Sequence, residues 1–378
     1  MKQTLPLFDT AGLLEPRTEG VKYAGSKLKI LPSILQLSEK VGAQTVLDGF
    51  SGTTRVSQAL AQNGYCVLSN DVAVWSEFFA TCYLRAKKPL SYYDELINYL
   101  NSVTPIEGWF TENYGGYPND GNAIQSDGLK KPWQIHNTMK LDGIREEIDQ
   151  LELDFADKAV AVTSLILALD KVDNTLGHFV SYLKEWSARS FNDLTLKVPN
   201  IIQSQGSHSV SRQDIFSVAK DTEADISYFD PPYGSNNEKM PPSRVRYNSY
   251  YHLWTTICLN DKPKLFGKAR RRIDSSDLAS PSVFEDFRRN EDGEFFAVKA
   301  IEKVIEITSS RWIILSYSSG GRATAEELNS VMKKNGELLD VVELDYKRNV
   351  MAEMKWTNEW LRDAENPNRE FLFLLEKG

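Results

Sequence analysis

Short apolar runs alternate along this chain with segments in which apolar residues recur every three or four positions. Residues 44–47 and 65–69 form two such runs, and each is followed by a segment that we predict to be helical, at residues 51–63 and 72–85. A short buried strand that leads through a tight turn into a helix is the repeating unit of a doubly wound sheet. The pattern therefore predicts an α/β fold.

The same alternation resumes in the C-terminal part of the chain. Residues 207–210, 226–229 and 312–317 are predicted to be strands. Helices are predicted at residues 247–259, 294–308 and 324–334. Residues 338–344 and 370–375 are predicted to pair as a final antiparallel hairpin. These elements would complete the sheet that the N-terminal part begins.

Residues 89–200 differ in character from the segments on either side. Loops rich in Gly, Asn and Pro at residues 115–121 precede long helical segments such as residues 155–169. A chain of 378 residues is longer than one minimal α/β unit, so a large insertion is expected. We predict that residues 1–88 and 201–378 form the two halves of an α/β domain, and that residues 89–200 are a mainly helical inserted region.

The most informative chemistry lies where the strand at residues 226–229 stops. Pro231 cannot continue a strand because it has no N–H and its φ is fixed, so Asp230 is held at the carboxyl end of the strand. Open α/β sheets bind their ligands at this end. Tyr233 adds a flat ring beside the carboxylate, which suits a planar ligand with an amino group, such as a nucleobase. The alternative is a strand-terminating turn in which Asp230 is a local cap.

Two further turns predict a ligand site. Gly49 and Gly52 follow the first strand, and glycines let the backbone approach a ligand closely. The chain lacks the G-x-G-x-x-G pattern there, so a nicotinamide-dependent dehydrogenase is disfavoured. The second strand ends at Asp71, and an acid at this place commonly accepts hydrogen bonds from ribose hydroxyls. An ordinary turn, with Asp71 as the cap of the helix at residues 72–85, is the alternative.

Composition limits the remaining possibilities. Hydrophobic residues make up 41% of the chain and charged residues 25%, as in soluble globular proteins, and no apolar run is long enough to span a membrane. Three cysteines lie far apart and four histidines are scattered, so no zinc-ligand spacing is present. We expect a cytoplasmic, monomeric protein with no signal peptide, no membrane segment and no metal site.

The charge of the chain is unevenly distributed. A net charge of −8 argues against a protein that merely coats nucleic acid. Lys268, Arg270, Arg271 and Arg272 nevertheless form a basic cluster downstream of the Asp230 turn. Such a run is usually solvated surface. It could also bind nucleic-acid phosphates, and this is the DNA-binding role that we predict for it.

Three motifs in a fixed order carry a family resemblance. They are Gly25-Ser26-Lys27, then Asp48-Gly49-Phe50-Ser51-Gly52-Thr53-Thr54, then Asp230-Pro231-Pro232-Tyr233. Together they resemble the DNA adenine-N6 methyltransferases of the Asp-Pro-Pro-Tyr class with α motif order (Dam-like). The family loop ends in a glycine where this chain has Thr54. The resemblance implies a Rossmann-like, seven-stranded S-adenosylmethionine-dependent methyltransferase sheet, with sequence-reading elements inserted at residues 89–200.

The resemblance also implies residue roles, with S-adenosylmethionine as cofactor and double-stranded DNA as partner. Asp230, Pro231, Pro232 and Tyr233 would form the catalytic turn around a flipped adenine. Lys27 would lie beside the cofactor carboxylate, and Asp214 and Ile215 beside its adenine; capping a helix is the alternative for Asp214. The full cofactor set would be Tyr23, Lys27, Asp48, Phe50, Ser51, Gly52, Thr53, Asp71, Asp214, Ile215 and Asp230.

The expected function is site-specific methylation of the adenine N6 amino group in duplex DNA, by a bacterial or phage restriction-modification or orphan enzyme. A cognate restriction endonuclease is a candidate partner. An amino-methyltransferase acting on cytosine N4 or on RNA adenine is an alternative, although cytosine enzymes usually carry Ser in place of Asp230. A non-catalytic DNA-binding regulator is another. Base recognition could also lie around residues 262–290 rather than in the inserted region.

Overall fold

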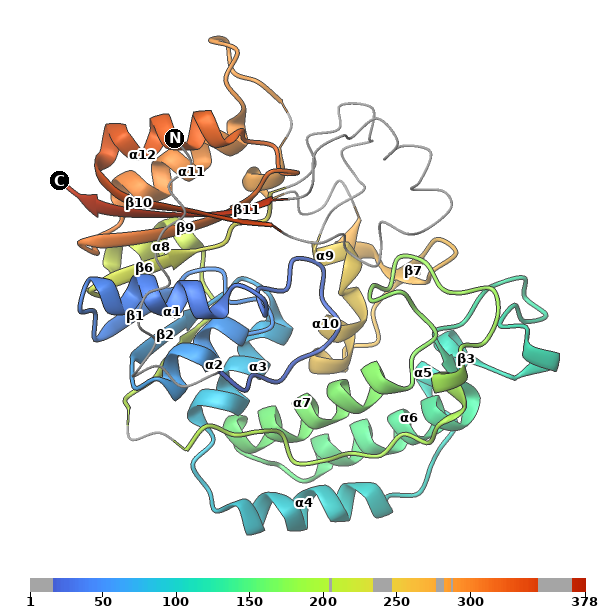
Figure 1. Ribbon diagram of the computed structural model, residues 1–378. Helices are drawn as coiled ribbons and strands as arrows, with labels where there is room; N and C mark the ends of the chain where they lie inside the picture. Colours follow the sequence, from blue (N-terminus) through green and yellow to red (C-terminus); the bar gives the residue numbers. More distant parts are fainter. Residues whose placement is uncertain (1–15, 204–205, 234–246, 277–281, 287, 346–368) are drawn as a thin grey trace.

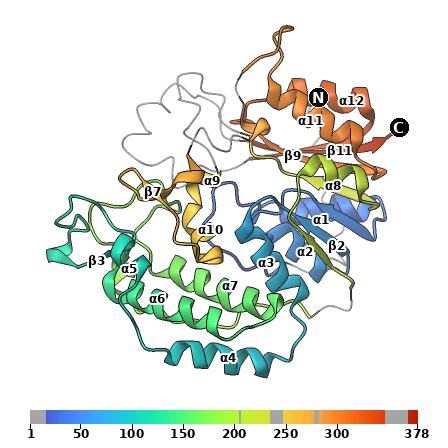
Figure 2. The ribbon, with the colours of Figure 1, turned by 180° about the vertical axis from the view of Figure 1, so that it is seen from behind.

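The computed structural model describes residues 16–203, 206–233, 247–276, 282–286, 288–345 and 369–378. Two parts lie side by side in Figure 1: a twisted sheet with helices on both faces, and a group of helices around α4, α6 and α7. Figure 2 shows the same two parts from behind. None of the helices within these ranges is long and apolar enough to cross a bilayer.

The sheet has seven strands in the order β10-β11-β9-β6-β1-β2-β5. Its strands are β1 (Thr45–Asp48), β2 (Cys66–Asn70), β5 (Ser209–Ser211), β6 (Ile226–Phe229), β9 (Trp312–Ser318), β10 (Gly336–Asp345) and β11 (Arg369–Lys377). β11 runs antiparallel to both of its neighbours, and the other pairs are parallel. The predicted α/β class, the mostly parallel sheet and the final antiparallel hairpin are confirmed.

Six helices cover the two faces of the sheet. They are α1 (Leu31–Lys40), α2 (Arg55–Gln62), α3 (Val74–Arg85), α8 (Ile215–Asp221), α11 (Phe296–Ile307) and α12 (Ala325–Asn335). Successive side chains of a strand point to opposite faces. Accordingly, Val46 of β1 belongs to the hydrophobic core that includes α1, α2 and α3, whereas its neighbour Leu47 packs with α8, α11 and α12. Burial on both faces explains why these strands read as continuous apolar runs.

The second part is built mainly from the inserted region. Its helices are α4 (Leu90–Ser102), α5 (Trp109–Tyr114), α6 (Ile135–Gln150) and α7 (Phe155–Lys171). The short elements are β3 (Gly115–Gly116), β4 (Trp133–Gln134), β7 (Leu265–Phe266), β8 (Arg271–Arg272), α9 (Tyr247–Tyr250) and the 3₁₀ turns Asn119–Gly121, Ala188–Phe191 and Ile273–Ser275. A further 3₁₀ turn, Val283–Glu285, packs against α11 on the sheet. α7 packs against α3, which joins the helical part to the sheet.

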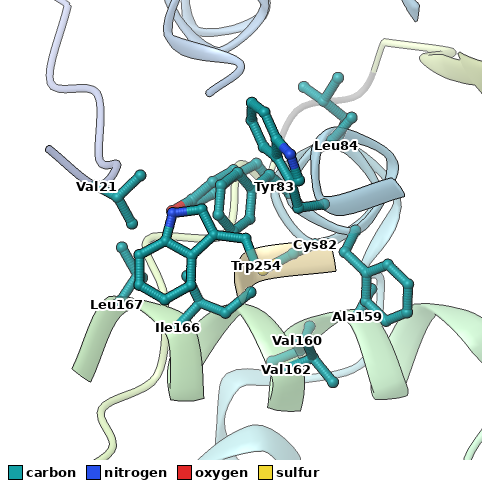
Figure 3. Packing of buried hydrophobic residues seen from close by; sticks show 14 of the residues in the cluster. Val21, Cys82, Tyr83, Leu84, Ala159, Val160, Val162, Ile166, Leu167 and Trp254 are labelled. Carbon is teal, nitrogen blue, oxygen red and sulfur yellow. The ribbon is translucent and has the colours of Figure 1, made fainter. Parts of the chain in front are cut away.

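Helix α10 (His252–Leu259) packs into the helical part, although it follows the Asp230 turn in the sequence. Trp254 is 1% exposed and lies close to Tyr83 of α3 and to Ile166 and Leu167 of α7 (Figure 3). Four of the eight residues of α10 are buried and apolar, so the helix requires apolar neighbours around most of its surface.

Polar contacts reinforce this association. The Arg145 guanidinium of α6 donates to the carbonyls of Ile257 and Cys258, at 2.6 and 3.1 Å, where α10 ends. These carbonyls have no hydrogen-bond partner within their own helix, so Arg145 supplies the hydrogen bonds that the end of α10 lacks. The Tyr251 hydroxyl accepts a hydrogen bond from the Ala24 amide at 2.7 Å. Tyr251 also separates α9 from α10, so the single helix predicted at residues 247–259 is two helices in the structure. Helix α10 therefore packs against both α3 and α7, at the boundary between the two parts.

Candidate active site

A cavity of about 600 Å³ lies at the carboxyl ends of β1, β2 and β6. Most of the predicted site residues line it, namely Tyr23, Lys27, Phe50, Ser51, Gly52, Thr53, Asp71, Asp214, Ile215, Asp230, Pro231, Pro232 and Tyr233. Asp48 does not line it, and neither do Lys268, Arg270, Arg271 and Arg272. Residues distant in sequence meet here because neighbouring parallel strands end at one edge of the sheet.

The turn after β1 forms one wall of the cavity. The Gly49 amide donates to the Tyr228 carbonyl at 3.0 Å, and a Cβ at Gly49 would approach Phe229 and Ile215 to 2.7 Å, so only glycine fits. Thr54, where the family loop has glycine, has a φ of +64°. This left-handed conformation favours glycine and is costly for a β-branched residue. The Gln58 amide group, which donates to the Thr54 hydroxyl at 3.1 Å, helps to hold it.

Asp71 holds this turn in place from the end of β2. Its carboxylate accepts hydrogen bonds from the backbone amides of Gly52 at 2.8 Å and Ala73 at 2.9 Å. Burial raises the pKa of Asp71, and the backbone hydrogen bonds oppose that rise. Asp71 does not cap α3, because the N-cap of that helix is Ala73; its contact with Gly52 joins the end of β2 to the turn after β1, and it lines the cavity.

Asp48 lies beneath the turn, with no exposed surface. The Ser57 hydroxyl of α2 donates to one carboxylate oxygen at 2.6 Å, and the other oxygen has no hydrogen-bond partner among the described residues. Burial raises the pKa of Asp48 to about 7. A direct contact with a bound ligand, which the family resemblance implied for Asp48, would therefore require the cavity to extend inward.

The Asp230 turn follows β6, and a buried lysine is bound to it. The Lys27 ammonium lies 2.9 Å from the Asp230 carboxylate, 2.8 Å from the Glu370 carboxylate of β11 and 3.3 Å from the Tyr233 hydroxyl. Lys27 was expected beside the cofactor carboxylate, but its ammonium contacts these two protein carboxylates. No local pattern in the sequence indicated Glu370, which lies 343 residues from Lys27.

The charges at this turn affect one another. Burial raises the pKa of Asp230, Lys27 opposes that rise, and the nearby Glu370 carboxylate adds to it. Burial also acts to lower the pKa of Lys27, but Asp230, Tyr233 and Glu370 outweigh it and raise that pKa well above its ordinary value. Lys27 is therefore an ammonium in this site. Its positive charge favours the ionised form of Asp230.

An aromatic corner lines the cavity beside the turn after β1. Phe284 stacks on Phe216 with ring centroids 5.8 Å apart and meets Phe50 edge-on at 5.1 Å. Asp214 accepts a hydrogen bond from the Phe216 amide at 2.9 Å, so it caps α8, as the alternative proposed, and also lines the cavity. Phe284 was not anticipated, because it lies in no motif.

The basic cluster corresponds only partly to its expected role. Arg272 is 4% exposed, and its guanidinium donates to both carboxylate oxygens of Asp261, at 2.8 and 2.7 Å, and of Asp274. The prediction that Arg272 binds DNA is therefore wrong, because its donors are engaged by these neighbouring acids. Lys268 is exposed in the turn of the β7–β8 hairpin, and Arg270 and Arg271 are half-buried.

The hairpin is fastened to the helical part by tyrosines. The Tyr114 hydroxyl donates to the Arg270 carbonyl at 2.7 Å, and the Tyr182 hydroxyl donates to the Ala269 carbonyl at 2.8 Å. These bonds fix the backbone of the turn that presents Lys268. The β7–β8 hairpin is therefore held against the inserted region.

Asp48 and Asp225 should affect the pH dependence of stability in opposite directions. The pKa of Asp48 is raised from 3.8 to about 7, so the folded state retains a proton that the unfolded state releases. Compared with Asp48→Asn, the wild-type free energy of unfolding should fall as pH rises from about 4 to 7, by ~1.4 kcal/mol per pH unit at most. Urea unfolding across this range measures the difference.

Asp225 provides the matched control. Burial opposes the shift, but hydrogen bonds from the Gln44 and Thr45 amides, both 2.8 Å, hold the pKa of Asp225 below its ordinary value. Its contribution should be present at neutral pH and be lost as pH falls below about 4. A pH-independent difference between wild type and Asp48→Asn would contradict the buried, protonated state of Asp48.

Comparisons with known proteins show the family to which the chain belongs. A family model for the D12 class N6 adenine-specific DNA methyltransferases matches residues 23–286. The chain is 28% identical to Type II methyltransferase M.FokI of Planomicrobium okeanokoites, over 94% of this chain and 53% of that protein. It is 28% identical to Modification methylase StsI of Streptococcus sanguinis, over 87% and 48%. It therefore spans about half the length of these two relatives. Type II methyltransferase M.NlaIII of Neisseria lactamica is 23% identical, over 94% of this chain and 99% of that protein.

Proposed function

The chain belongs to the D12 class of N6 adenine-specific DNA methyltransferases, and on this basis we propose that it transfers a methyl group from S-adenosylmethionine to the N6 amino nitrogen of adenine in double-stranded DNA. The observation that carries the proposal is one cavity that brings together the turn after β1, Asp71 at the end of β2 and the Asp230 turn. We further propose that it acts at a specific DNA site, in the cytoplasm, as a monomer. A cognate restriction endonuclease is its proposed biological partner.

The cavity suits S-adenosylmethionine chemically. Asp71 offers a carboxylate to ribose hydroxyls, and the turn at residues 49–53 brings the backbone close to the methionine end. Ile215 and the aromatic corner of Phe50 and Phe284 provide apolar surface for a purine, with Asp214 available for its amino group. When bound, the cofactor supplies an electrophilic methyl group, so the protein itself needs to supply only positioning and electrostatics.

The difficulty in the reaction lies with the target nitrogen, whose lone pair is delocalised into the adenine ring. Hydrogen bonds from the amino group to the Asp230 carboxylate and the Pro231 carbonyl would localise that lone pair on the nitrogen. A hydrogen bond to a charged group contributes ~1.5–3 kcal/mol, which corresponds to about one to two decades in rate. Lys27 assists because its positive charge favours the carboxylate form of Asp230.

The target base must leave the duplex to reach this turn. The Tyr233 ring lines the cavity three residues after Asp230 and would stack on the flipped base. Stacking of a base on an aromatic side chain is worth ~1–3 kcal/mol, which offsets part of the stacking lost in the duplex. Asp230 need not remove a proton before the transfer, because the methylated nitrogen is far more acidic and can lose its proton afterwards.

The central prediction is that the purified protein methylates adenine in duplex DNA and that Asp230→Ala abolishes turnover. Cofactor affinity in this variant should stay within a few-fold of wild type, because the hydrogen bonds that are lost belong to the target base. Digestion of the product to nucleosides identifies the methylated base. Methylated cytosine, or methylation of RNA or protein alone, would overturn the adenine assignment.

A second prediction separates cofactor contacts from base contacts. Asp71→Ala should weaken S-adenosylmethionine binding by ~1–3 kcal/mol for each hydrogen bond that it loses. Tyr233→Ala should bind the cofactor almost normally and lose DNA turnover instead. Calorimetry with cofactor alone measures both variants. Equal losses of cofactor affinity would show that this division of roles is wrong.

A third prediction concerns the β7–β8 hairpin as a phosphate-binding element. Lys268→Ala combined with Arg271→Ala should weaken binding to cognate and random duplexes alike. Each lost phosphate contact should reduce the slope of log affinity against log salt by ~0.9. Lys303→Ala combined with Lys333→Ala, on α11 and α12, removes the same charge elsewhere and serves as the control. Identical salt slopes for the two double variants would leave the hairpin as solvated surface.

A further inference from the structure

Glu370 is a buried acid to which the proposed reaction gives no role. It belongs to β11, is 4% exposed, and does not line the cavity. Its carboxylate receives the Lys27 ammonium at 2.8 Å and the Ser316 hydroxyl of β9 at 2.9 Å. Within the described residues, Glu370 therefore contacts the site only through other side chains.

The three charged groups form a chain with Lys27 in the middle. Lys27 is 6% exposed and lies between the carboxylates of Glu370 and Asp230, at 2.8 and 2.9 Å. One ammonium thus serves two carboxylates, and the set carries a net charge of −1. A lysine paired with Asp230 alone would neutralise it and weaken it as an acceptor for an incoming amino group.

Stability alone does not account for this arrangement. Removing charged groups from water is costly, and buried ion pairs are often replaced by apolar residues with no loss of stability. Here the cost is incurred at the wall of the cavity, beside the residue on which the proposed chemistry depends. Ser316 adds a hydrogen bond that fixes the Glu370 carboxylate, which in turn fixes the position of Lys27.

We propose that Glu370 is a positioning residue for methyl transfer: it shares the Lys27 ammonium with Asp230, so that Asp230 keeps the strength of a charged acceptor for the target amino group. This inference rests on the proposed function. Lys27 and Glu370 thus act on Asp230 in opposite directions. Lys27 favours the ionised form of Asp230, whereas Glu370 limits how fully Lys27 neutralises the Asp230 carboxylate. Glu370 itself contacts no substrate.

Removal of Glu370 and removal of Lys27 should shift the pH dependence of the methyl-transfer rate in opposite directions. The negative charge of Glu370 raises the pKa of Asp230, and the positive charge of Lys27 lowers it. In single-turnover assays, Glu370→Gln should therefore move the acid limb of the pH–rate profile to lower pH. Its plateau rate should fall about tenfold, because Lys27 then pairs with Asp230 alone. Lys27→Met should move the acid limb to higher pH.

Other titratable groups near Asp230 must be distinguished from it. In the described chain they are the carboxyls of Asp48 and Asp71 and the hydroxyls of Tyr23, Tyr228, Tyr233 and Tyr247. The tyrosine pKa values all lie above 10, so these hydroxyls do not titrate on the acid limb. Repeating the Glu370→Gln comparison in an Asp48→Asn background removes one of the two carboxyls, and the shift should persist. Asp71 is present in both of the proteins compared, so it does not account for a difference between them.

Two variants separate charge from distance and from general damage. Glu370→Asp keeps the charge but withdraws it by one methylene, so its acid limb should stay near that of wild type while its plateau rate falls. Glu376→Gln makes the same substitution six residues along β11, where the acid pairs with Arg311 at 2.7 Å, and it should behave as wild type. Glu370→Gln, Glu370→Asp and Glu376→Gln should each bind S-adenosylmethionine within a few-fold of wild type.

The outcomes are distinct. If Glu370→Gln matches Glu376→Gln in rate and acid limb, or if it loses cofactor affinity, the positioning role is wrong. Should Glu370→Gln fail to fold, the plateau rate of Glu370→Asp decides, and a wild-type rate would equally reject the inference. If the wild-type protein methylates a different amine, the proposed function fails, and the Glu370 comparison can still be made on that amine.

Discussion

The site depends on three parallel strands that end together at one edge of the sheet. β1 lies between β2 and β6, and main-chain hydrogen bonds continue past the strand ends: the Ser51 amide donates to the Asn70 carbonyl at 2.9 Å, and the Gly49 amide donates to the Tyr228 carbonyl. The turn after β1 is thereby held between the ends of its two neighbours. The acids at these strand ends are fixed by the sheet itself, so the cavity is preformed before any ligand binds.

Three acids within one small, buried region would repel one another if all were equally charged. The structure gives each a different environment. Asp48 is buried, which raises its pKa to about 7, whereas two backbone amides stabilise the Asp71 carboxylate. Asp230 is paired with Lys27, which Glu370 shares. Burial raises the pKa of all three acids, and each is held by a different partner: a hydroxyl at Asp48, backbone amides at Asp71 and the Lys27 ammonium at Asp230.

The sequence predicted what local patterns control. Asp71 and Asp230 could be placed because each directly follows an apolar run, and Gly49 and Gly52 because a strand-to-helix turn requires them. Glu370 and Phe284 could not, because each reaches the cavity region through tertiary packing and lies in no motif. Arg272 was misassigned because a run of basic residues does not reveal which acids will pair with them; Asp261 and Asp274 fold back onto it. Contacts between distant segments were the part that could not be predicted.

The helical part also contributes to the cavity, through the segments that connect it to the sheet. Before α1, the Lys22 ammonium donates to Asp173 and to the Asp170 carbonyl, both at 2.6 Å, and its neighbour Tyr23 lines the cavity. After the Asp230 turn, Tyr247 lines the cavity at the start of α9, and α10 packs on α7. Both connecting segments are therefore anchored to the helical part of the structure. The Tyr23 and Tyr247 rings also contact each other, with centroids 5.4 Å apart, so the two connecting segments meet at the wall of the cavity.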